Sequence, residues 1–397
     1  MVTSWRRVTL GDLERESQGV IQTGPFGSQL HASDYSTFGT PVVMPTNIRG
    51  LRIDPNGIAR VASHHVDLLA RHVLRSGDIV YSRRGDVEKC ALVTEHEAGW
   101  LCGTGCLLVR VQGETADARF LSYALSLPET RAWISQHAVG ATMPNLNTSI
   151  LREVGVQLPP IEEQQRVGAT LVALDDKIDS NRRAMSLAME TARSHVDRAI
   201  AGHSMVSYGQ ALQVRMGSAF KGVQFSVPSV GRPLLRIRDL KTFESQTWTN
   251  EERSDEVVIR PGDVVVGMDA EFRATLWLGL ESVMNQRVCS FVGQRGVGRA
   301  FVLAALEPQL AFQEAAKTGT TVIHLNKADI DTFEVPDLTS EEHKELSELT
   351  EPLIDLVVAR SKEVRSLAAM RDALLPELLA GRIRVPEETD SVHRTAS

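Results

Sequence analysis

The sequence has 397 residues and a formal net charge of −7, with 42% hydrophobic and 23% charged residues. This length and composition predict a soluble protein of two or three folded domains and exclude a disordered chain. No apolar run approaches the roughly 20 residues of a membrane span, and the N-terminus lacks the apolar core of a secretion signal. We therefore expect a cytoplasmic protein with no membrane contact, whose four cysteines are reduced thiols.

The acidic charge is concentrated at the C-terminal end. Residues 337–397 contain 8 Lys and Arg against 13 Asp and Glu, whereas residues 1–157 contain 15 of each kind and residues 204–336 contain 14 against 15. A nucleic-acid partner is therefore not excluded by the net charge. Any affinity for DNA must come from local basic clusters or be shared with a basic partner.

The chain contains an internal repeat. The offset between matching segments falls steadily along the chain, as expected when related halves have loops of different length. Such a single long period predicts a duplicated unit with pseudo-twofold symmetry rather than a solenoid. The matching segments are 41–48 with 233–240 (offset 192), 77–81 with 262–266 (185), 120–125 with 301–306 (181), and 140–147 with 319–326 (179).

Within each copy, short strand patterns come first and a long helix follows. Brief apolar or β-branched runs separated by Gly, Pro and Asp predict a mixed, mostly β domain, with one helix near 118–137 in the first copy. The fold class is therefore α+β. The predicted strands are 38–44, 78–81, 90–94 and 105–111 in the first copy, and 233–237, 257–266, 275–278 and 287–292 in the second.

Each copy ends in a segment with an apolar stripe of helical period. After Pro159-Pro160 the stripe follows a heptad pattern, and Thr339 with Glu342 has the spacing of a capping box before the second helix. Asn181 and His195 are polar positions in the first stripe, which we interpret as setting the register. The predicted stripe residues are Val167, Leu171, Leu174, Ile178, Asn181, Met185, Ala188, Ala192, His195 and Ala199, then Leu346, Leu349, Leu353, Val357, Val364, Leu367, Leu374 and Leu378.

Two long helices with matching stripes in one chain should pair with each other, and the pseudo-twofold symmetry makes that pairing an antiparallel coiled coil. We expect two globular domains held apart by this rigid spacer. The predicted boundaries are 1–157 for the first globular domain, 158–203 for the first helix, 204–336 for the second domain, 337–385 for the second helix, and 386–397 for a disordered tail.

Known catalytic motifs are missing from the sequence. There is no phosphate-binding Gly-x-x-x-x-Gly-Lys-Ser/Thr loop and no Asn/Asp-Pro-Pro-Tyr/Phe motif of an amino-methyltransferase. Cys90, Cys102 and Cys106 lack the further closely spaced Cys or His pair that a zinc site would need. We therefore predict no catalysis, no bound metal and no cofactor in this chain.

Polar and basic residues follow corresponding strands in the two copies. Arginine can bind guanine edges or phosphates through two hydrogen bonds, and Asn or Gln can do the same with adenine. For any single residue, a solvated surface charge is an equally good interpretation, but two matching sets favour double-stranded DNA as the partner. The candidates are Ser28, Gln29, Asn47, Arg49, Arg83, Arg84 and Lys89 in the first copy, and Lys221, Arg236, Arg238, Lys241 and Arg273 in the second.

Four segments resemble the specificity subunit of type I restriction-modification systems. The segment Gly24-Pro-Phe-Gly-Ser-Gln-Leu30 and the segment from Gly217 to Leu240 resemble the openings of two target recognition domains. Leu158-Pro-Pro-Ile-Glu-Glu-Gln-Gln-Arg166 is similar to the junction into the family's first spacer helix, and Leu374-Leu-Pro-Glu-Leu-Leu-Ala-Gly-Arg-Ile383 resembles its second helix end. The second copy departs from the first in having His324 where the first has Asn145.

The resemblance implies a non-catalytic subunit that reads a split, asymmetric DNA sequence through its two recognition domains. It also implies that the helices dock two methyltransferase subunits, that endonuclease and translocase subunits can join, and that S-adenosylmethionine, ATP and magnesium bind to those partners. Two other interpretations remain open. One is a self-contained DNA methyltransferase or nuclease, and the other is a scaffold that joins proteins without binding DNA.

Overall fold

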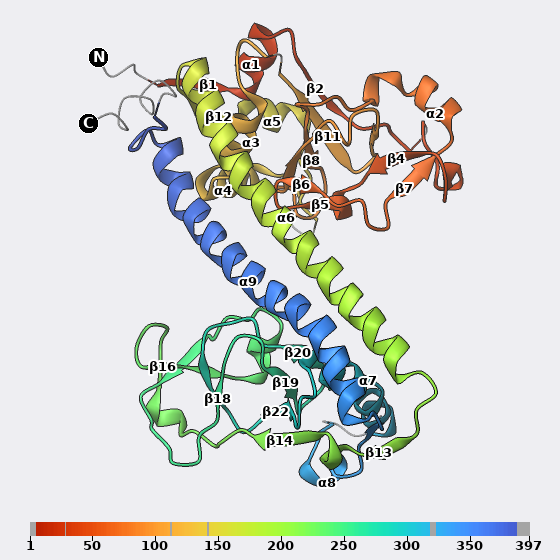
Figure 1. Cartoon of the computed structure of the whole chain (residues 1–397). Helices are drawn as coiled ribbons and strands as arrows, with labels where there is room; N and C mark the ends of the chain where they lie inside the picture. Colours follow the sequence, from red (N-terminus) through yellow and green to blue (C-terminus); the bar gives the residue numbers. More distant parts are fainter. Residues whose placement is uncertain (1–4, 28, 112, 141–142, 318–322, 387–397) are drawn as a thin grey trace, which may run out of the picture. The chain divides into compact units, whose positions relative to one another are not determined.

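The computed structural model describes residues 5–27, 29–111, 113–140, 143–317 and 323–386. The chain divides into two compact units (Figure 1). Unit 1 consists of the described residues within 1–176 and 368–397, and unit 2 consists of those within 177–367. Both units combine sheets with helices. The predicted α+β class is therefore confirmed.

Unit 1 is built around two sheets with the strand orders β2-β11-β8-β9 and β10-β4-β7-β3. Strand β11 pairs antiparallel with both β2 and β8, whereas β10 pairs in parallel with β4. The strands are β1 (Arg6–Thr9), β2 (Val20–Thr23), β3 (Tyr35–Ser36), β4 (Thr40–Val43), β5 (Ile48–Arg49), β6 (Arg52–Ile53), β7 (Ala59–Val61), β8 (Ile79–Ser82), β9 (Cys90–Leu92), β10 (Leu101–Cys102), β11 (Cys106–Arg110) and β12 (Gly155–Leu158).

Short helices accompany the sheets in the described part of unit 1. The single helix expected at 118–137 is divided, because Pro128 begins a new helix and the residue before a proline disfavours helical backbone. Strand β12 pairs with β1 and leads into the first long helix. The short helices are α1 (Leu10–Glu16), α2 (Ser63–Leu68), α3 (Ala118–Ser126), α4 (Pro128–His137) and α5 (Thr148–Glu153).

Unit 2 repeats this strand arrangement. Its sheets have the orders β14-β22-β19-β20 and β15-β17-β16-β21-β18, and β16 pairs with β21 in parallel as β4 does with β10. Its elements are β13 (Met205–Ser207), β14 (Leu212–Met216), β15 (Phe225–Ser226), β16 (Arg232–Leu235), β17 (Thr247–Thr249), β18 (Val258–Ile259), β19 (Val264–Gly267), β20 (Ala274–Leu276), β21 (Ser282–Met284), β22 (Val288–Gly293), α7 (Arg299–Ala316), α8 (Lys327–Ile330) and β23 (Glu334–Pro336).

The central strands supply side chains to two cores in each unit. In β11, Leu107 packs with Phe120 and the α3 face, while Leu108 points into a second cluster. In β19, Val264 and Val266 lie in one cluster and Val265 in another. Since successive side chains of a strand point to opposite faces, a continuous apolar run is what such a doubly covered strand requires.

Two helices of 40 residues each complete the fold: α6 (Ile161–Ile200) and α9 (Ser340–Leu379). The predicted capping box opens α9, since the Thr339 N–H donates to Glu342 Oε2 at 2.7 Å and the Glu342 N–H donates to Thr339 Oγ1 at 3.3 Å. At 1.5 Å per residue, each helix is about 60 Å long. This is several times the length of an average globular helix.

The two helices run antiparallel in each unit taken by itself. In unit 1, Asp175 of α6 pairs with Arg371 of α9 at 2.7 Å, and the earlier residue Glu163 lies 3.9 Å from the later residue Arg384. In unit 2, Lys177 lies 3.5 Å from Glu363, and His203, just beyond α6, lies 3.3 Å from Glu342. In each unit, the residue numbers therefore increase along the α6 segment while those of the contacting residues in the α9 segment decrease.

The residues packed along α9 differ from those predicted. Leu349 is 56% exposed, whereas Thr350 and Ile354 are fully buried. The buried positions Leu346, Thr350, Ile354, Val357 and Ser361 are spaced by four, four, three and four residues. The predicted apolar stripe therefore included the wrong side chain at Leu349. Leu353 and Leu367 are partly buried.

Along α6, the predicted stripe is closer to the packed face. Val196 is fully buried in place of its neighbour His195, which is only partly covered. The predicted register residue Asn181 is 2% exposed, and its Nδ2 group has no hydrogen-bond acceptor among the described residues. Val167, Leu171 and Ile178 are buried, and Leu174 and Met185 are partly buried.

The predicted helix segments 158–203 and 337–385 contain α6 and α9 respectively. The division into five segments remains a prediction, and the proposed tail lies outside the described residues apart from Pro386. In the described part of the chain, no helix is both long enough and apolar enough to cross a membrane.

Candidate nucleic-acid interface

Arg83 and Arg84 directly follow β8 in unit 1. The Arg83 backbone N–H donates to the carbonyl of Gly105 at 2.8 Å, and the guanidinium carbon lies 5.9 Å from the centre of the Phe26 ring. Arg84 is exposed and forms a backbone bridge with Asn145. Its side chain has no hydrogen-bond or ion-pair partner in the described part of the chain. Phe26, Gly105 and Asn145, which come from three different loops, therefore lie near the end of β8.

The other candidates of unit 1 are already engaged with the protein. Arg49 pairs with Asp54 at 3.1 Å, and Lys89 forms an ion pair with Asp86. The Gln29 side-chain carbonyl accepts the Phe26 N–H at 3.1 Å. Ser28 lies outside the described residues.

Asn47 was predicted to contact DNA, and the structure contradicts this. The residue is 5% exposed. Its Oδ1 accepts the Met44 N–H at 3.0 Å, and its Nδ2 donates to the carbonyl of Asp54 at 3.1 Å. The side chain therefore closes the loop between β4 and β6 instead of facing solvent, because a buried amide needs partners inside the protein.

The candidates of unit 2 lie in two places. Arg238, Lys241 and Arg273 line a groove of about 2050 Å³ between the second half of α6, the helix α7 and the loops after β16 and β19. Lys241 pairs there with Glu271 at 3.1 Å. Lys221 and Arg236 lie instead near the ends of β14 and β16. The Arg236 guanidinium carbon lies 5.5 Å from the centre of the Phe225 ring.

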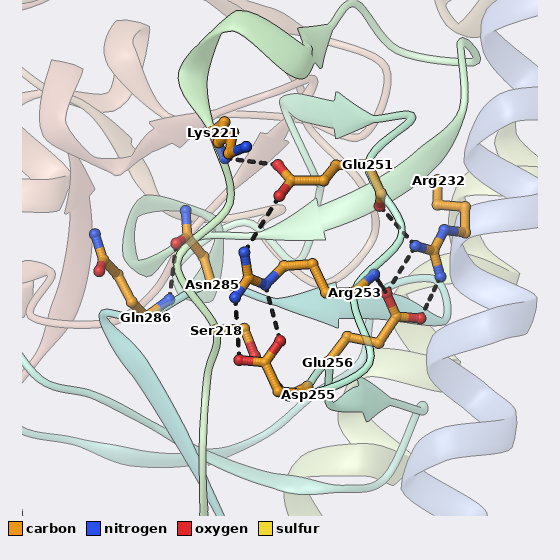
Figure 2. Close-up of polar contacts among 9 residues, drawn as sticks. All are labelled: Ser218, Lys221, Arg232, Glu251, Arg253, Asp255, Glu256, Asn285 and Gln286. Carbon is orange, nitrogen blue, oxygen red and sulfur yellow. Dashed lines mark hydrogen bonds and ion pairs between the residues drawn. The ribbon is translucent and has the colours of Figure 1, made fainter.

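A network of arginines and carboxylates supports the loops around Lys221, as Figure 2 shows. Arg232 holds Glu256 through two hydrogen bonds of 2.6 and 2.9 Å, and Arg253 holds Asp255 through bonds of 2.9 and 3.1 Å. The Lys221 backbone N–H donates to Glu251 at 2.7 Å. These pairs keep the loops in place while compensating their own charges.

The pKa directions agree with that interpretation. The hydrogen bond from Arg232 lowers the pKa of Glu256, and the hydrogen bond from Arg253 lowers the pKa of Asp255. Both carboxylates are therefore ionised at neutral pH, and each neutralises its arginine. Arg232 and Arg253 are positioning residues, and the exposed Lys221 ammonium forms no ion pair within the part of the chain that the structure describes.

The turn 285–287 between β21 and β22 was not identified from the sequence. Asn285 is partly exposed, and Gln286 and Arg287 are exposed. In Figure 2, Asn285 and Gln286 lie beside the arginine network. A signal was present in the sequence, since Asn, Gln and Arg are the residues that bind base edges through paired hydrogen bonds.

The described residues contain no group of three His, Cys, Asp or Glu side chains that could hold a metal ion. All four cysteines are buried and unpaired. Burial raises the pKa of Cys90 and Cys102 to about 12. These thiols are core residues without the thiolate character that a nucleophile or metal ligand needs.

Each unit of the duplicated α+β framework carries exposed Arg or Lys side chains in loops that follow its strands, and these side chains have the chemistry of a nucleic-acid recognition surface. Comparison with known proteins agrees. Residues 70–186 match the family model of the type I restriction modification DNA specificity domain. The chain is therefore similar to type I restriction-modification specificity subunits.

Individual relatives are similar over different shares of the chain. The EcoBI specificity subunit of Escherichia coli is 29% identical over 183 residues, which is 45% of this chain and 39% of that subunit. The MjaIX specificity subunit of Methanocaldococcus jannaschii is 22% identical over 315 residues, or 68% of this chain and 70% of that one. The crystal structure of the M. genitalium S subunit shares the fold with a TM-score of 0.67, at 14% identity and over 95% of this chain and 96% of that one.

Proposed function

We propose that this chain is the DNA-reading subunit of a type I restriction-modification complex, in which each unit reads one part of a split, asymmetric site. The observation that carries the proposal is the duplication itself. Two units with the same strand arrangement present different polar side chains at equivalent loop ends, as a reader of two unlike half-sites requires. The chain would act on double-stranded DNA in the cytoplasm.

The chain would not be catalytic itself. Methyltransferase subunits would supply S-adenosylmethionine and methylate adenine, and endonuclease subunits would use ATP and magnesium. Support for docking comes from apolar side chains that the long helices leave exposed. Leu187 of α6 is 63% exposed, and Leu349 and Met370 of α9 are 56% and 51% exposed. A docked methyltransferase subunit would cover these side chains.

Co-expression with the methyltransferase subunit of the same system tests the proposal. Sequencing of methylated adenines should show one split motif with a constant gap. The matched control is the methyltransferase expressed without this chain, which should leave those sites unmethylated. Methylation with no sequence preference would contradict DNA reading by this chain.

Two further measurements separate the proposal from the other interpretations. A self-contained methyltransferase would bind S-adenosylmethionine as the pure chain, and we expect no such binding by calorimetry. A scaffold would leave DNA mobility unchanged even with the methyltransferase present. We also expect Leu349→Glu to weaken co-purification of the methyltransferase, with the exposed Glu348→Gln as the control.

A further inference from the structure

The turn 285–287 of unit 2 has a structural counterpart in unit 1. Before the turn, Met284 pairs in parallel with Leu235, just as Cys102 pairs with Val43. After it, Cys289 pairs with Met216 as Leu107 pairs with Thr23. Both connections span the same number of residues, so 285–287 corresponds to 103–105.

A close contact confirms this correspondence independently of the strand register. A Cβ atom placed on Gly217 would lie 2.0 Å from the carbonyl oxygen of Asn285. A Cβ atom placed on Gly24 would lie 1.9 Å from the carbonyl oxygen of Gly103. Each unit therefore brings a glycine of its opening loop against the first residue of the turn.

The two turns carry different chemistry. In unit 1 the sequence is Gly-Thr-Gly, which offers a single hydroxyl group, whereas in unit 2 it is Asn-Gln-Arg. Asn285 Oδ1 accepts the Gln286 backbone N–H at 2.7 Å, which leaves the Nδ2 amide without an acceptor among the described residues. Figure 2 shows the Gln286 side chain pointing away from the arginine network. Its amide forms no hydrogen bond within the part of the chain that the structure describes.

Arg287 is held at the other end of the turn. Its Nε lies 3.6 Å from Asp269 Oδ2, and its side chain is 51% exposed. Asp269 is itself fixed by His324, whose Nδ1 lies 2.7 Å from Asp269 Oδ1. The guanidinium is therefore oriented but keeps donors for a ligand, since it carries five N–H groups.

Unit 1 places its arginines differently on the same framework. The Arg83 N–H donates to the carbonyl of Gly105, as the Met268 N–H donates to that of Arg287. The backbone of Arg84 forms an isolated antiparallel β-bridge with Asn145, as the backbone of Asp269 does with His324. Unit 1 thus carries arginines where unit 2 has Met268 and Asp269, and unit 2 carries its arginine on the turn instead.

We propose that the turn 285–287 is the base-reading element of unit 2, with the Gln286 amide binding an adenine edge and the Arg287 guanidinium binding a guanine edge in the major groove. The corresponding turn of unit 1 does not read bases, and Arg83 and Arg84 take its place there. The inference rests on the proposed DNA-reading function. It assigns half-site specificity to four named positions, which are Gln286 and Arg287 in unit 2 and Arg83 and Arg84 in unit 1.

The test uses the complex of this chain with its methyltransferase subunit and selection from a duplex library of random sequence. Gln286→Ala and Arg287→Ala should each relax the preference at one or two positions of a single half-site, by roughly 5-fold to 100-fold per position. The matched control, Thr104→Ala in the equivalent turn, should leave both half-sites unchanged. Unchanged preferences in both unit 2 variants, with the wild type still selecting a motif, would overturn the inference while leaving the proposed function intact.

A charge-conserving variant separates base reading from phosphate contact. Arg287→Lys keeps the charge but loses the planar pair of donors, so it should relax the guanine position without changing the salt dependence of binding. The turn has no residue with positive φ, and the altered side chains are exposed, so these variants should fold. A wild-type complex that selects no sequence at all would instead refute the proposed function.

Discussion

Arg110 and Asp78 form a buried, bidentate ion pair in unit 1. Arg110 Nε lies 2.7 Å from Asp78 Oδ1 and Nη2 lies 2.6 Å from Oδ2, and the Asp78 side chain is 1% exposed. The repeat places Asp263 at the equivalent position of unit 2. There the arginine comes from another strand, since Arg215 of β14 lies 3.7 Å from Asp263 and both side chains are 33% exposed.

This difference in burial predicts that removing the arginine lowers the free energy of unfolding more in unit 1 than in unit 2. Arg110→Ala leaves a buried carboxylate without its partner and should destabilise unit 1 by about 3–5 kcal/mol. Arg215→Ala removes a half-exposed pair and should cost unit 2 about 0–1 kcal/mol. Urea unfolding followed by hydrogen exchange of peptides from each unit measures both values. Equal losses in the two units would contradict the argument.

His72 predicts a pH dependence of stability in unit 1. Its side chain is 1% exposed, and neither ring nitrogen has a hydrogen-bond partner among the described residues. Burial lowers the pKa of His72 to about 4, with the charge of Arg71 acting in the same direction. The unfolded chain, with a histidine pKa near 6.5, therefore binds the proton more readily than the folded chain.

His72 should consequently leave the free energy of unfolding at its full value above about pH 6.5. As the pH drops towards 4, the free energy of unfolding should fall by up to about 3 kcal/mol. Chemical denaturation at several pH values measures this slope. His72→Leu is the control and should remove the slope in that window, because leucine does not titrate. A slope that survives in this variant would assign the effect to another group.

Variants of Arg84 and Arg238 test whether each unit reads only its own half-site. If Arg84 contacts a base, Arg84→Ala should cost roughly 1–3 kcal/mol of binding and relax only the half-site of unit 1. We expect Arg238→Ala to affect only the half-site of unit 2. Competition binding with half-site variants at several salt concentrations measures both effects. A uniform loss with a salt slope reduced by about one unit would assign the residue to phosphate contact.

Arg49→Ala is a matched control for these variants. The Arg49 guanidinium is exposed but already paired with Asp54 at 3.1 Å. Its removal should leave the preferred sequence unchanged. A shift in one half-site for Arg49→Ala would place the loop after β5 in the interface as well.

The repeat and the long helices could be predicted because each leaves a periodic signal over many residues. Which side of α9 is packed against the protein could not be predicted from the sequence. The stripe contains Thr350, whose hydroxyl donates to the carbonyl of Leu346 at 2.8 Å and so needs no partner outside the helix. A polar residue whose hydroxyl is hydrogen-bonded within its own helix can be buried, whereas the predicted apolar stripe took the more apolar Leu349. Burial of α9 against α7 and the sheet also widens the packed face beyond a coiled-coil seam.

The candidate site was predicted less completely than the fold. Asn47 and Gln286 are both amides in loops after strands, but only the tertiary structure shows that one amide closes its own loop and the other is exposed. The turn 285–287 shares no residue with its counterpart Gly-Thr-Gly, so the repeat could not reveal it by similarity. Strand register makes the correspondence, and register is a property of the folded sheet.

The two long helices are expected to act as a ruler that sets the length of the gap between the two half-sites. Each helix belongs to both units, with the division after Asp176 in α6 and after Leu367 in α9. Four residues inserted at each of these two points add about 6 Å of helix while nearly keeping the phase of the apolar stripe. Since B-DNA advances about 3.4 Å per base along a strand, the preferred gap should lengthen by one or two base pairs. Both half-sites should keep their sequence, because neither insertion touches a reading loop.

Insertion into α6 alone is the matched control for this ruler. It makes α6 longer than α9 between the Asp175–Arg371 and Lys177–Glu363 ion pairs, so two continuous helices cannot keep both pairs. We therefore expect the single insertion to lower stability and methylation, and only the double insertion to give a new, well-defined gap. Sequencing of methylated sites measures the outcome. An unchanged gap in a stable double-insertion variant, or altered bases within a half-site, would show that the helices do not set the spacing.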